Sequence, residues 1–235
     1  MIKLLQSALK AMRPHQWVKN ILVFAPLILS FKFTHPEFIL QAILAFVAFS
    51  LSASSLYIIN DLLDIESDRL HPKKKNRPFA SGSLSVSWGI GQSILLLIIA
   101  VMLAINLNIE FLITLLIYSG LSALYSFKLK QIVLLDVSIL AVLYTLRIIA
   151  GTFAVSVDLS YWLIVFSIFI FTSLAMVKRV SELHNLKLQE REKAKGRGYT
   201  VDDREMISAL GSASGFVAVL VLALYIHDPL TVQRY

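Results

Sequence analysis

Four polar residues end the second apolar stretch of the chain and continue into the segment that follows. They are Asn60, Asp61, Asp64 and Asp68 in the run Asn60-Asp61-Leu-Leu-Asp64-Ile-Glu-Ser-Asp68. On a continuous helix, aspartates at positions i, i+3 and i+7 share one face. Carboxylates so close together repel one another unless they share a cation, and Mg²⁺ prefers hard oxygen ligands together with substrate phosphates. The spacing therefore predicts that Asp61, Asp64 and Asp68 bind Mg²⁺, with Asn60 beside them.

A basic segment follows these aspartates directly, with Lys73, Lys74, Lys75 and Arg77. Lysine and arginine side chains are well suited to contact phosphate oxygens. Carboxylates for a metal next to cations for phosphate are the arrangement expected where a diphosphate leaves. The alternative is that the charges cap a helix and anchor it at the membrane surface. We select Lys74 and Arg77 as the phosphate-binding candidates.

A second group of polar residues surrounds the start of the fifth apolar stretch and comprises Tyr125, Lys130, Asp136 and Arg147. Apolar residues flank Asp136, and Arg147 follows three helical turns later on nearly the same face. Ionisable residues at membrane depth are costly and usually face a polar cavity. We expect a second metal or phosphate subsite here; the alternative is a structural Asp–Arg interaction between neighbouring helices.

Two further polar runs lie beside apolar stretches. The run Lys178-Arg179-Val-Ser-Glu182 follows the sixth stretch and leads to a charged segment that ends Lys195-Gly-Arg-Gly-Tyr199. Glycines beside Arg and Tyr indicate a loop able to fold over a phosphate-bearing substrate. The sequence does not distinguish Lys178, Arg179 and Glu182 as functional residues. We select Lys178 as the phosphate-binding candidate.

The other run precedes the first apolar stretch and reads Arg13-Pro-His-Gln16-Trp17-Val-Lys19-Asn20. Aromatic and basic residues in this position are typical of an anchor at the membrane interface, which accounts for Trp17. Arg13, Gln16 and Lys19 could instead bind an anionic lipid headgroup, and we keep them as substrate-binding candidates.

The composition requires these groups to be positioned by membrane helices. Of the 235 residues, 57% are hydrophobic and 16% are charged, whereas a soluble domain has about 25% charged residues. This excludes an ordinary cytosolic enzyme, a nucleic-acid-binding domain and a disordered protein. Since a membrane helix needs about 20 apolar residues, we expect an all-α, polytopic transmembrane bundle in one domain, 1–235, with about seven spans, near residues 20–34, 38–60, 87–106, 109–127, 132–152, 160–177 and 206–226.

The distribution of basic residues predicts the orientation of this bundle. Most Lys and Arg residues lie in four segments: the N-terminus and those after the second, fourth and sixth stretches. By the positive-inside tendency these segments, and the site they contain, face the cytoplasm. The net charge of +7 therefore reflects topology and is no evidence for nucleic-acid binding. Pro26 is expected to kink or break the first span, because proline removes a helix hydrogen bond.

The run Asn60–Asp68 resembles the first motif, NDxxDxxxD, of the UbiA superfamily of intramembrane prenyltransferases. The sequence around it is similar to the branch formed by the decaprenyl-phosphate phosphoribosyltransferases. The matching segments are Arg13–Asn20, His71-Pro-x-Lys74 through Arg77-Pro-x-Ala-Ser-Gly82, Tyr125-Ser-x-x-Leu-Lys130 with Asp136, and Arg147-Ile-Ile-Ala-Gly151. The superfamily usually has nine helices, and aromatic-acceptor members usually carry a second aspartate pair where Asp136 stands alone.

The resemblance implies an enzyme that transfers 5-phosphoribose from phosphoribosyl pyrophosphate to a membrane polyprenyl phosphate and releases pyrophosphate, in the synthesis of an arabinose donor for the cell envelope. The implied cofactor is Mg²⁺ on Asp61, Asp64 and Asp68. Asp136 would complete a metal shell or contact the ribose hydroxyls. Lys74, Arg77, Lys130 and Lys178 would neutralise phosphate charge. Association into a homo-oligomer is left open.

Two alternatives remain. The first is a prenyltransferase of the same superfamily with a polyprenyl diphosphate donor and an aromatic acceptor, which would use the same aspartates and Mg²⁺. The second is a transporter in which Asp136 and Arg147 form a coupling pair. It predicts broken helices and polar residues at the membrane midplane, and the third, fourth and seventh stretches contain few such residues.

Overall fold

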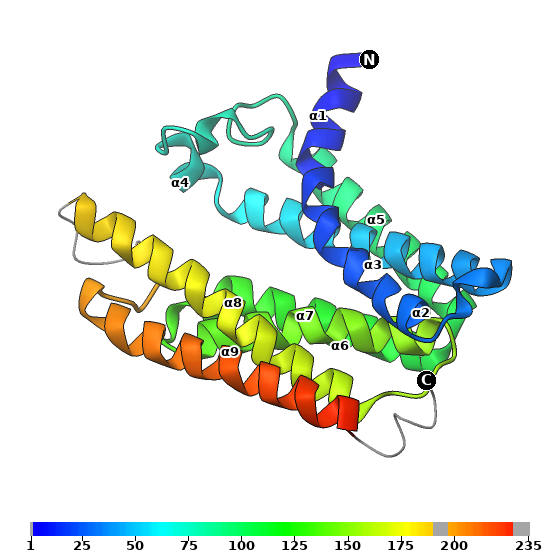
Figure 1. Cartoon of the computed structure of the whole chain (residues 1–235). Helices are drawn as coiled ribbons and strands as arrows, with labels where there is room; N and C mark the ends of the chain where they lie inside the picture. Colours follow the sequence, from blue (N-terminus) through cyan, green and yellow to red (C-terminus); the bar gives the residue numbers. More distant parts are fainter. Residues whose placement is uncertain (1, 190–196, 228–235) are drawn as a thin grey trace. The chain divides into compact units, whose positions relative to one another are not determined.

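The computed structural model describes residues 2–189 and 197–227, and its described part is all-helical (Figure 1). The order of the elements is α1 (Ile2–Met12), η1 (Pro14–Phe24), α2 (Ala25–Leu29), η2 (Lys32–Thr34), α3 (Pro36–Leu63), α4 (Ile65–Arg69), η3 (Lys74–Asn76), α5 (Val86–Leu107), α6 (Ile109–Phe127), η4 (Leu129–Gln131), α7 (Leu135–Ala154), α8 (Tyr161–Leu188), η5 (Val201–Asp203) and α9 (Arg204–His227), where η marks a 3₁₀ helix. The predicted all-α membrane fold is confirmed.

Six helices in the described part are long and apolar enough to cross a membrane, one fewer than the sequence predicts. They are α3, α5, α6, α7, α8 and the segment Val201–His227 that contains α9. The expected first span, 20–34, is divided among η1, α2 and η2. Pro26 lies in the first turn of α2, and since proline has no backbone N–H to donate, one regular helix does not continue through it. The expectation of a break there is met.

Polar side chains begin several of the helices. Ser85 accepts a hydrogen bond from the Trp88 backbone N–H at the start of α5. Ser160 does the same for Leu163 at the start of α8. Such N-caps satisfy backbone donors that have no partner within the first turn of a helix. These caps set where α5 and α8 begin within long apolar runs.

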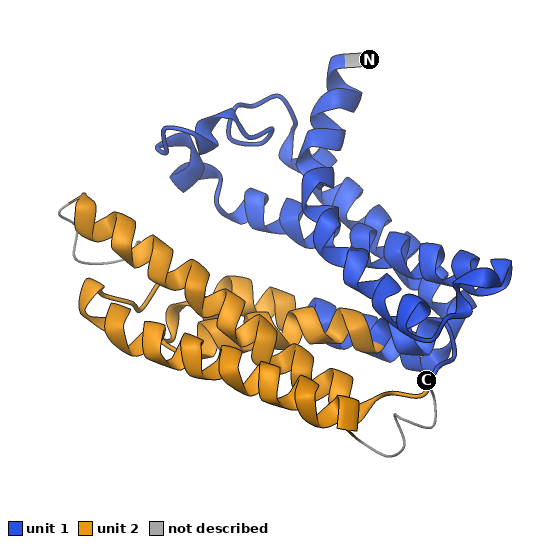
Figure 2. Cartoon of the chain, viewed as in Figure 1, with its two compact units in different colours: residues 1–120, 150–157 blue, residues 121–149, 158–235 orange. Residues whose placement is uncertain are grey.

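The chain forms two compact units, which are described separately (Figure 2). Unit 1 comprises Met1–Gly120 and Ala150–Val157, and unit 2 comprises Leu121–Ile149 and Asp158–Tyr235. In unit 1, α3 packs against α5. Gly89 of α5 lies so close to the Phe79 ring that a Cβ there would approach it to 2.6 Å. A glycine here lets the Phe79 ring, which lies in the segment before α5, pack directly against that helix.

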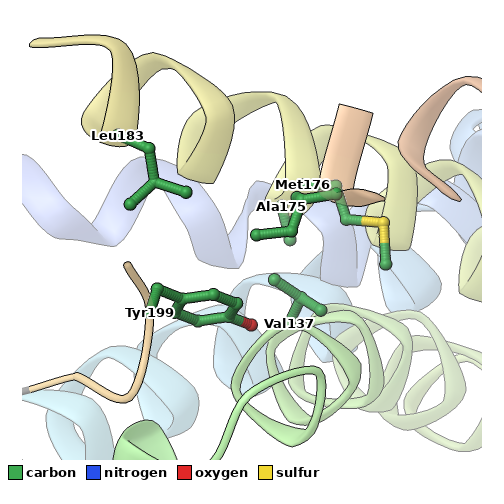
Figure 3. Packing of buried hydrophobic residues seen from close by; sticks show 6 residues of the cluster. Val137, Ala175, Met176, Leu183 and Tyr199 are labelled. Carbon is green, nitrogen blue, oxygen red and sulfur yellow. The ribbon is translucent and has the colours of Figure 1, made fainter. Parts of the chain in front are cut away.

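In unit 2, α8 and α9 run side by side in opposite directions (Figure 1). Ser173 Oγ donates to the Gly211 carbonyl at 2.8 Å, and Ser214 Oγ donates to the Phe169 carbonyl at 2.9 Å. A hydrophobic cluster formed by residues of α7, α8 and α9 includes the Tyr199 ring, which lies next to Val137 of α7 (Figure 3). Hydroxyl-to-carbonyl bonds between α8 and α9, together with this packing, hold α7, α8 and α9 of unit 2 together.

Candidate functional site

The first cluster of charged residues lies in unit 1, where α3 ends. Asp61, in the last turn of α3, and Asp68, in α4, are 2% and 1% exposed. Arg77 donates from one atom, Nη1, to Asp61 Oδ1 at 3.0 Å and to Asp68 Oδ2 at 2.6 Å. Arg13 donates to the same Asp61 oxygen. The two carboxylates are therefore close enough to share a cation.

Arg13 reaches Asp61 because the chain turns sharply between α1 and η1. Its backbone has φ +54°, in the left-handed region that non-glycine residues seldom adopt. Its guanidinium also lies 5.2 Å from the centre of the Tyr57 ring. Lys74 of η3 adds a further cation, with Nζ 3.9 Å from Asp68 Oδ1. We call these five residues, Asp61, Asp68, Arg13, Arg77 and Lys74, the first cluster.

Asp64 does not join the first cluster. The helix is interrupted at this residue, which ends α3 and precedes α4 with φ −95° and ψ 8°, and its side chain is exposed. The expectation that all three aspartates share one helical face assumed a continuous helix, and the break removes that basis. Within the described residues, no group of three or more acidic, histidine or cysteine side chains is gathered as a metal site.

The first cluster nevertheless fits a magnesium–diphosphate group. Mg²⁺ is usually bound by one or two carboxylates while substrate phosphates and water supply its other ligands. Asp61 and Asp68 provide two carboxylates around one cation position, which Arg77 Nη1 holds in this structure. Arg13 pairs with Asp61 and is 22% exposed, and Lys74 pairs with Asp68 and is 44% exposed. These are cations that a diphosphate could contact.

The segment before the first cluster is held by hydrogen bonds to α3. Trp17 Nε1 donates to Ser54 Oγ at 3.0 Å, and Asn20 Nδ2 donates to Ser50 Oγ at 3.0 Å. Trp17 therefore has a structural partner in addition to any role at the interface. Gln16 and Lys19, which are substrate-binding candidates, are half-buried in η1, and Asn60 is half-buried in the last turns of α3.

The second cluster lies in unit 2 and surrounds Asp136, which is fully buried in the first turn of α7. Tyr125 donates from its hydroxyl to Asp136 Oδ1 at 2.7 Å. Arg179 of α8 lies 2.6 Å from Oδ2, and Arg197 donates to Oδ1 at 3.1 Å. Arg179 and Arg197 also form ion pairs with Glu182. We call Asp136, Arg179, Arg197, Glu182 and Tyr125 the second cluster.

The charge states within this cluster follow from its contacts. Burial opposes the charge on Arg197, but the nearby Asp136, Tyr125 and Glu182 together outweigh that effect and raise the pKa of Arg197. Burial, with Asp136 nearby, raises the pKa of the Tyr199 phenol, against the opposing effect of the Leu134 backbone N–H that donates to it at 2.9 Å. Arg197 is thus a cation and Tyr199 a neutral phenol at neutral pH.

The segment 197–199 packs closely on the stretch before α7. A Cβ on Gly198 would lie 2.4 Å from the Gln131 carbonyl oxygen, so a larger residue would push this segment away. The neighbouring Tyr199 is fully buried, and its ring centre lies 5.3 Å from the Arg179 guanidinium. Gly198 thus lets the segment 197–199 lie against Gln131, and Arg197 is thereby held beside Asp136.

Three other candidates around the second cluster have different surroundings. Arg147 is 5% exposed, donates to the Leu143 carbonyl at 2.6 Å within its own helix, and lies over the Tyr144 ring. The arginines paired with Asp136 are thus Arg179 and Arg197. Lys130 is half-buried in η4, and Lys178 is exposed on α8. The structure places Arg179, the neighbour of Lys178, against the carboxylate.

The sequence does not separate Lys178 from Arg179, because the helical phase of α8 is ambiguous. Lys178 lies on the side of α8 that carries the exposed residues Leu174 and Val177, whereas Arg179 lies on the side that carries the buried Met176. Apolar residues occupy both faces because one meets lipid and the other meets protein, so apolar periodicity does not separate them. The run Arg197-Gly-Tyr199 was noted for its composition, but no local signal indicated that it pairs with Asp136.

The comparisons with known proteins agree with this architecture. The sequence pattern of the UbiA prenyltransferase family matches residues 21–232. Nodulation protein NoeC of Azorhizobium caulinodans is 36% identical over 93% of this chain and 71% of its own length. Decaprenyl-phosphate phosphoribosyltransferase of Mycobacterium tuberculosis H37Rv is 34% identical over 77% of this chain and 61% of its own length. A third relative is matched over 42% of its length.

The fold is also that of a solved structure. A UbiA homologue from Archaeoglobus fulgidus, bound to DMAPP and Mg²⁺, has a TM-score of 0.76 at 20% identity, and the match covers 94% of this chain and 78% of that chain. With the family pattern spanning most of its length and its helices arranged in the same fold, the chain belongs to the UbiA prenyltransferase family.

Proposed function

We propose that this protein transfers the 5-phosphoribosyl group of phosphoribosyl pyrophosphate to a membrane polyprenyl phosphate. The observation that carries the proposal is that Asp136 is paired with two arginines, Arg179 and Arg197. A carboxylate held in this way is suited to position cations for an additional phosphate. A donor with a phosphate on its sugar needs such cations, and an aromatic acceptor does not. The 34% identity to decaprenyl-phosphate phosphoribosyltransferases supports the same substrate class.

In the proposed reaction the bond between ribose C1 and the pyrophosphate oxygen breaks, and its electron pair leaves with pyrophosphate. An anionic oxygen of the polyprenyl phosphate forms the new bond to C1 from the opposite face, so the configuration inverts. No general base is required because the attacking oxygen carries no proton. Positive charge develops at C1, and fixed carboxylates nearby stabilise such charge.

The first cluster is assigned to the leaving group. Asp61 and Asp68 would hold Mg²⁺, which supplies charge neutralisation for the departing pyrophosphate. Arg13, Arg77 and Lys74 would contact the phosphate oxygens, since Arg13 pairs with Asp61, Lys74 with Asp68 and Arg77 with both. Asp64 as a third ligand, Asn60 as an orienting residue, and Gln16 and Lys19 as contacts for the lipid phosphate stay predictions.

The second cluster and its neighbours are assigned to the remaining phosphate and hydroxyl groups. Tyr125 and Asp136 form one hydrogen-bonded unit that orients the arginines. Lys130, Lys178 and Arg147 stay predictions as phosphate contacts. We also propose that the site faces the cytoplasm, because basic residues concentrate in the segments that contain it.

The test is transfer of label from radiolabelled phosphoribosyl pyrophosphate into the lipid phase by purified protein with decaprenyl phosphate. We expect transfer with Mg²⁺ and none with EDTA. Asp61→Asn should abolish transfer, whereas Asp158→Asn, a carboxylate exposed before α8, should retain it. Asp64→Asn shows whether the third aspartate of the motif takes part.

Two results would contradict the proposal. One is the absence of Mg²⁺-dependent label under conditions in which the same protein joins a prenyl diphosphate to an aromatic acid, because that outcome establishes the aromatic-acceptor alternative. The other is full turnover by Asp61→Asn. Intrinsic tryptophan fluorescence during heating checks that each variant is folded.

A further inference from the structure

Four charged residues of the second cluster form a closed ring in which carboxylates and guanidiniums alternate. Asp136 Oδ2 lies 2.6 Å from Arg179 Nη2, and Arg179 Nη1 pairs with Glu182 Oε2. Glu182 Oε1 lies 3.7 Å from Arg197 Nε, and Arg197 Nη1 lies 3.1 Å from Asp136 Oδ1. Both guanidiniums therefore contact both carboxylates. The four formal charges sum to zero.

The two carboxylates of the ring differ in burial. Asp136 is fully buried and its partner Arg179 is 1% exposed, so this pair is enclosed by protein. Glu182 is 38% exposed, and its 3.7 Å contact with Arg197 is the longest in the ring. Exposed ion pairs contribute little stability because water screens them. Glu182 is thus the most exposed member of the ring, and its side chain can turn into solvent when another anion takes its place beside Arg179.

The guanidiniums would keep their positions without Glu182. Asp136 holds both of them, the Tyr199 ring lies 5.3 Å from Arg179, and Tyr125 donates to Asp136. Arg179 also has a buried Nε with no hydrogen-bond partner among the described residues. Two fixed arginines around one displaceable anion form a favourable site for a phosphate, because guanidinium groups bind phosphate oxygens in pairs.

We propose that the Glu182 carboxylate occupies the position of a substrate's phosphate monoester, which displaces it and binds to Arg179 and Arg197. This inference rests on the proposed function and assigns a ligand to its second cluster. Asp136 acts as a positioning residue that aims the arginines. The phosphate monoester is either the 5-phosphate of the sugar donor or the phosphate of the polyprenyl acceptor, and the chemistry of the site is the same for both.

The proposal predicts opposite effects for two substitutions. Glu182→Gln removes a competing anion, so the KM for the substrate that carries the phosphate should fall about two- to fivefold. Arg197→Gln removes a charged donor, so the same KM should rise about tenfold or more. Arg197→Lys keeps the charge but lacks the paired donors, so its KM should lie between those of the wild type and Arg197→Gln. If Glu182 were a metal ligand, Glu182→Gln would raise the KM.

The experiment measures the KM for each substrate in turn, with the other saturating, using the full chain in lipid-containing micelles. The substrate whose KM moves identifies the source of the phosphate. Glu205→Gln and Lys187→Gln, which remove exposed charges of the same sign on α9 and α8, are the matched controls and should leave both KM values unchanged. A melting curve for each variant confirms folding.

A second measurement separates this inference from the proposed function. Inorganic phosphate should bind the wild-type protein weakly and Glu182→Gln more tightly, as followed by isothermal titration calorimetry without any other substrate. If the wild type transfers no phosphoribose, the proposed function fails, and this titration alone decides the inference. If Glu182→Gln binds phosphate or substrate equally well or more weakly than the wild type, the inference is overturned.

Discussion

Replacing Asp136 by asparagine should destabilise the protein, because it leaves a buried arginine without its main counter-charge. Asp136 is fully buried and Arg179 is 1% exposed, with 2.6 Å between Oδ2 and Nη2. The substitution keeps the size of the side chain and leaves an oxygen that can accept from the Tyr125 hydroxyl. The change is therefore mainly the loss of one charge at a place where water does not replace it.

The magnitude follows from burial. Removing one partner of a buried ion pair costs about 3–5 kcal/mol. Since Arg179 keeps its contact with Glu182, the lower end applies, about 3 kcal/mol. The matched variant Glu182→Gln removes the other carboxylate of the ring, which is 38% exposed, and should cost about 1 kcal/mol or less. Adding Arg179→Met to Asp136→Asn removes the uncompensated charge and should recover part of the loss.

The assay is thermal unfolding in detergent micelles, followed by intrinsic tryptophan fluorescence. At about 2–4 °C per kcal/mol for a chain of this length, Asp136→Asn should melt at least about 6 °C below the wild type. The Glu182→Gln variant should stay within a few degrees of it. Equal melting temperatures for the two single variants would refute the burial argument, because they would show that Asp136 and Glu182 are equally accessible to water.

Two other predictions concern the packing of unit 1. A Cβ on Gly151 of α7 would lie 2.2 Å from the Val23 carbonyl oxygen, so Gly151→Ala should destabilise by about 1–3 kcal/mol through overpacking. Gly120→Ala, at a helical position with nothing within 4 Å of the added Cβ, should stabilise the protein by about 0.5–1 kcal/mol. The melting temperatures of the two variants should therefore shift in opposite directions. A rise for both would contradict the close approach of Gly151 to the Val23 carbonyl. Trp17→Phe removes the donor to Ser54 and should cost about 0.5–1.5 kcal/mol, measured as a melting-temperature difference that disappears when Ser54 is alanine.

Six of the expected spans were predictable because a membrane helix is specified locally. An apolar run of sufficient length satisfies its own backbone hydrogen bonds within the segment, and the expected stretch 109–127 coincides with α6. The first stretch differs because its conformation depends on contacts outside it. Asn20 bonds to Ser50 of α3, and Pro26 interrupts the helix. The proline was visible in the sequence, whereas the bond to α3 was not.

The acidic motif was only partly predictable from its spacing. Asp61 and Asp68 are brought together, but Asp64 is exposed at the break between α3 and α4. Spacing predicts a shared face only while the helix is continuous. The two cations on Asp61 come from residues 48 and 16 positions away, Arg13 and Arg77, and no local rule relates such separations.

By itself, the sequence determined that the chain is a helical membrane protein with acidic and basic groups next to its apolar stretches, since length, hydropathy and charge are sums over neighbouring residues. Only the tertiary structure decided which charges meet. Asp136 pairs with Arg179 and with Arg197, 61 residues away, while Lys178 stays exposed. The physical reason is that a buried charge must find a counter-charge, and which residue supplies it depends on how helices distant in sequence pack together.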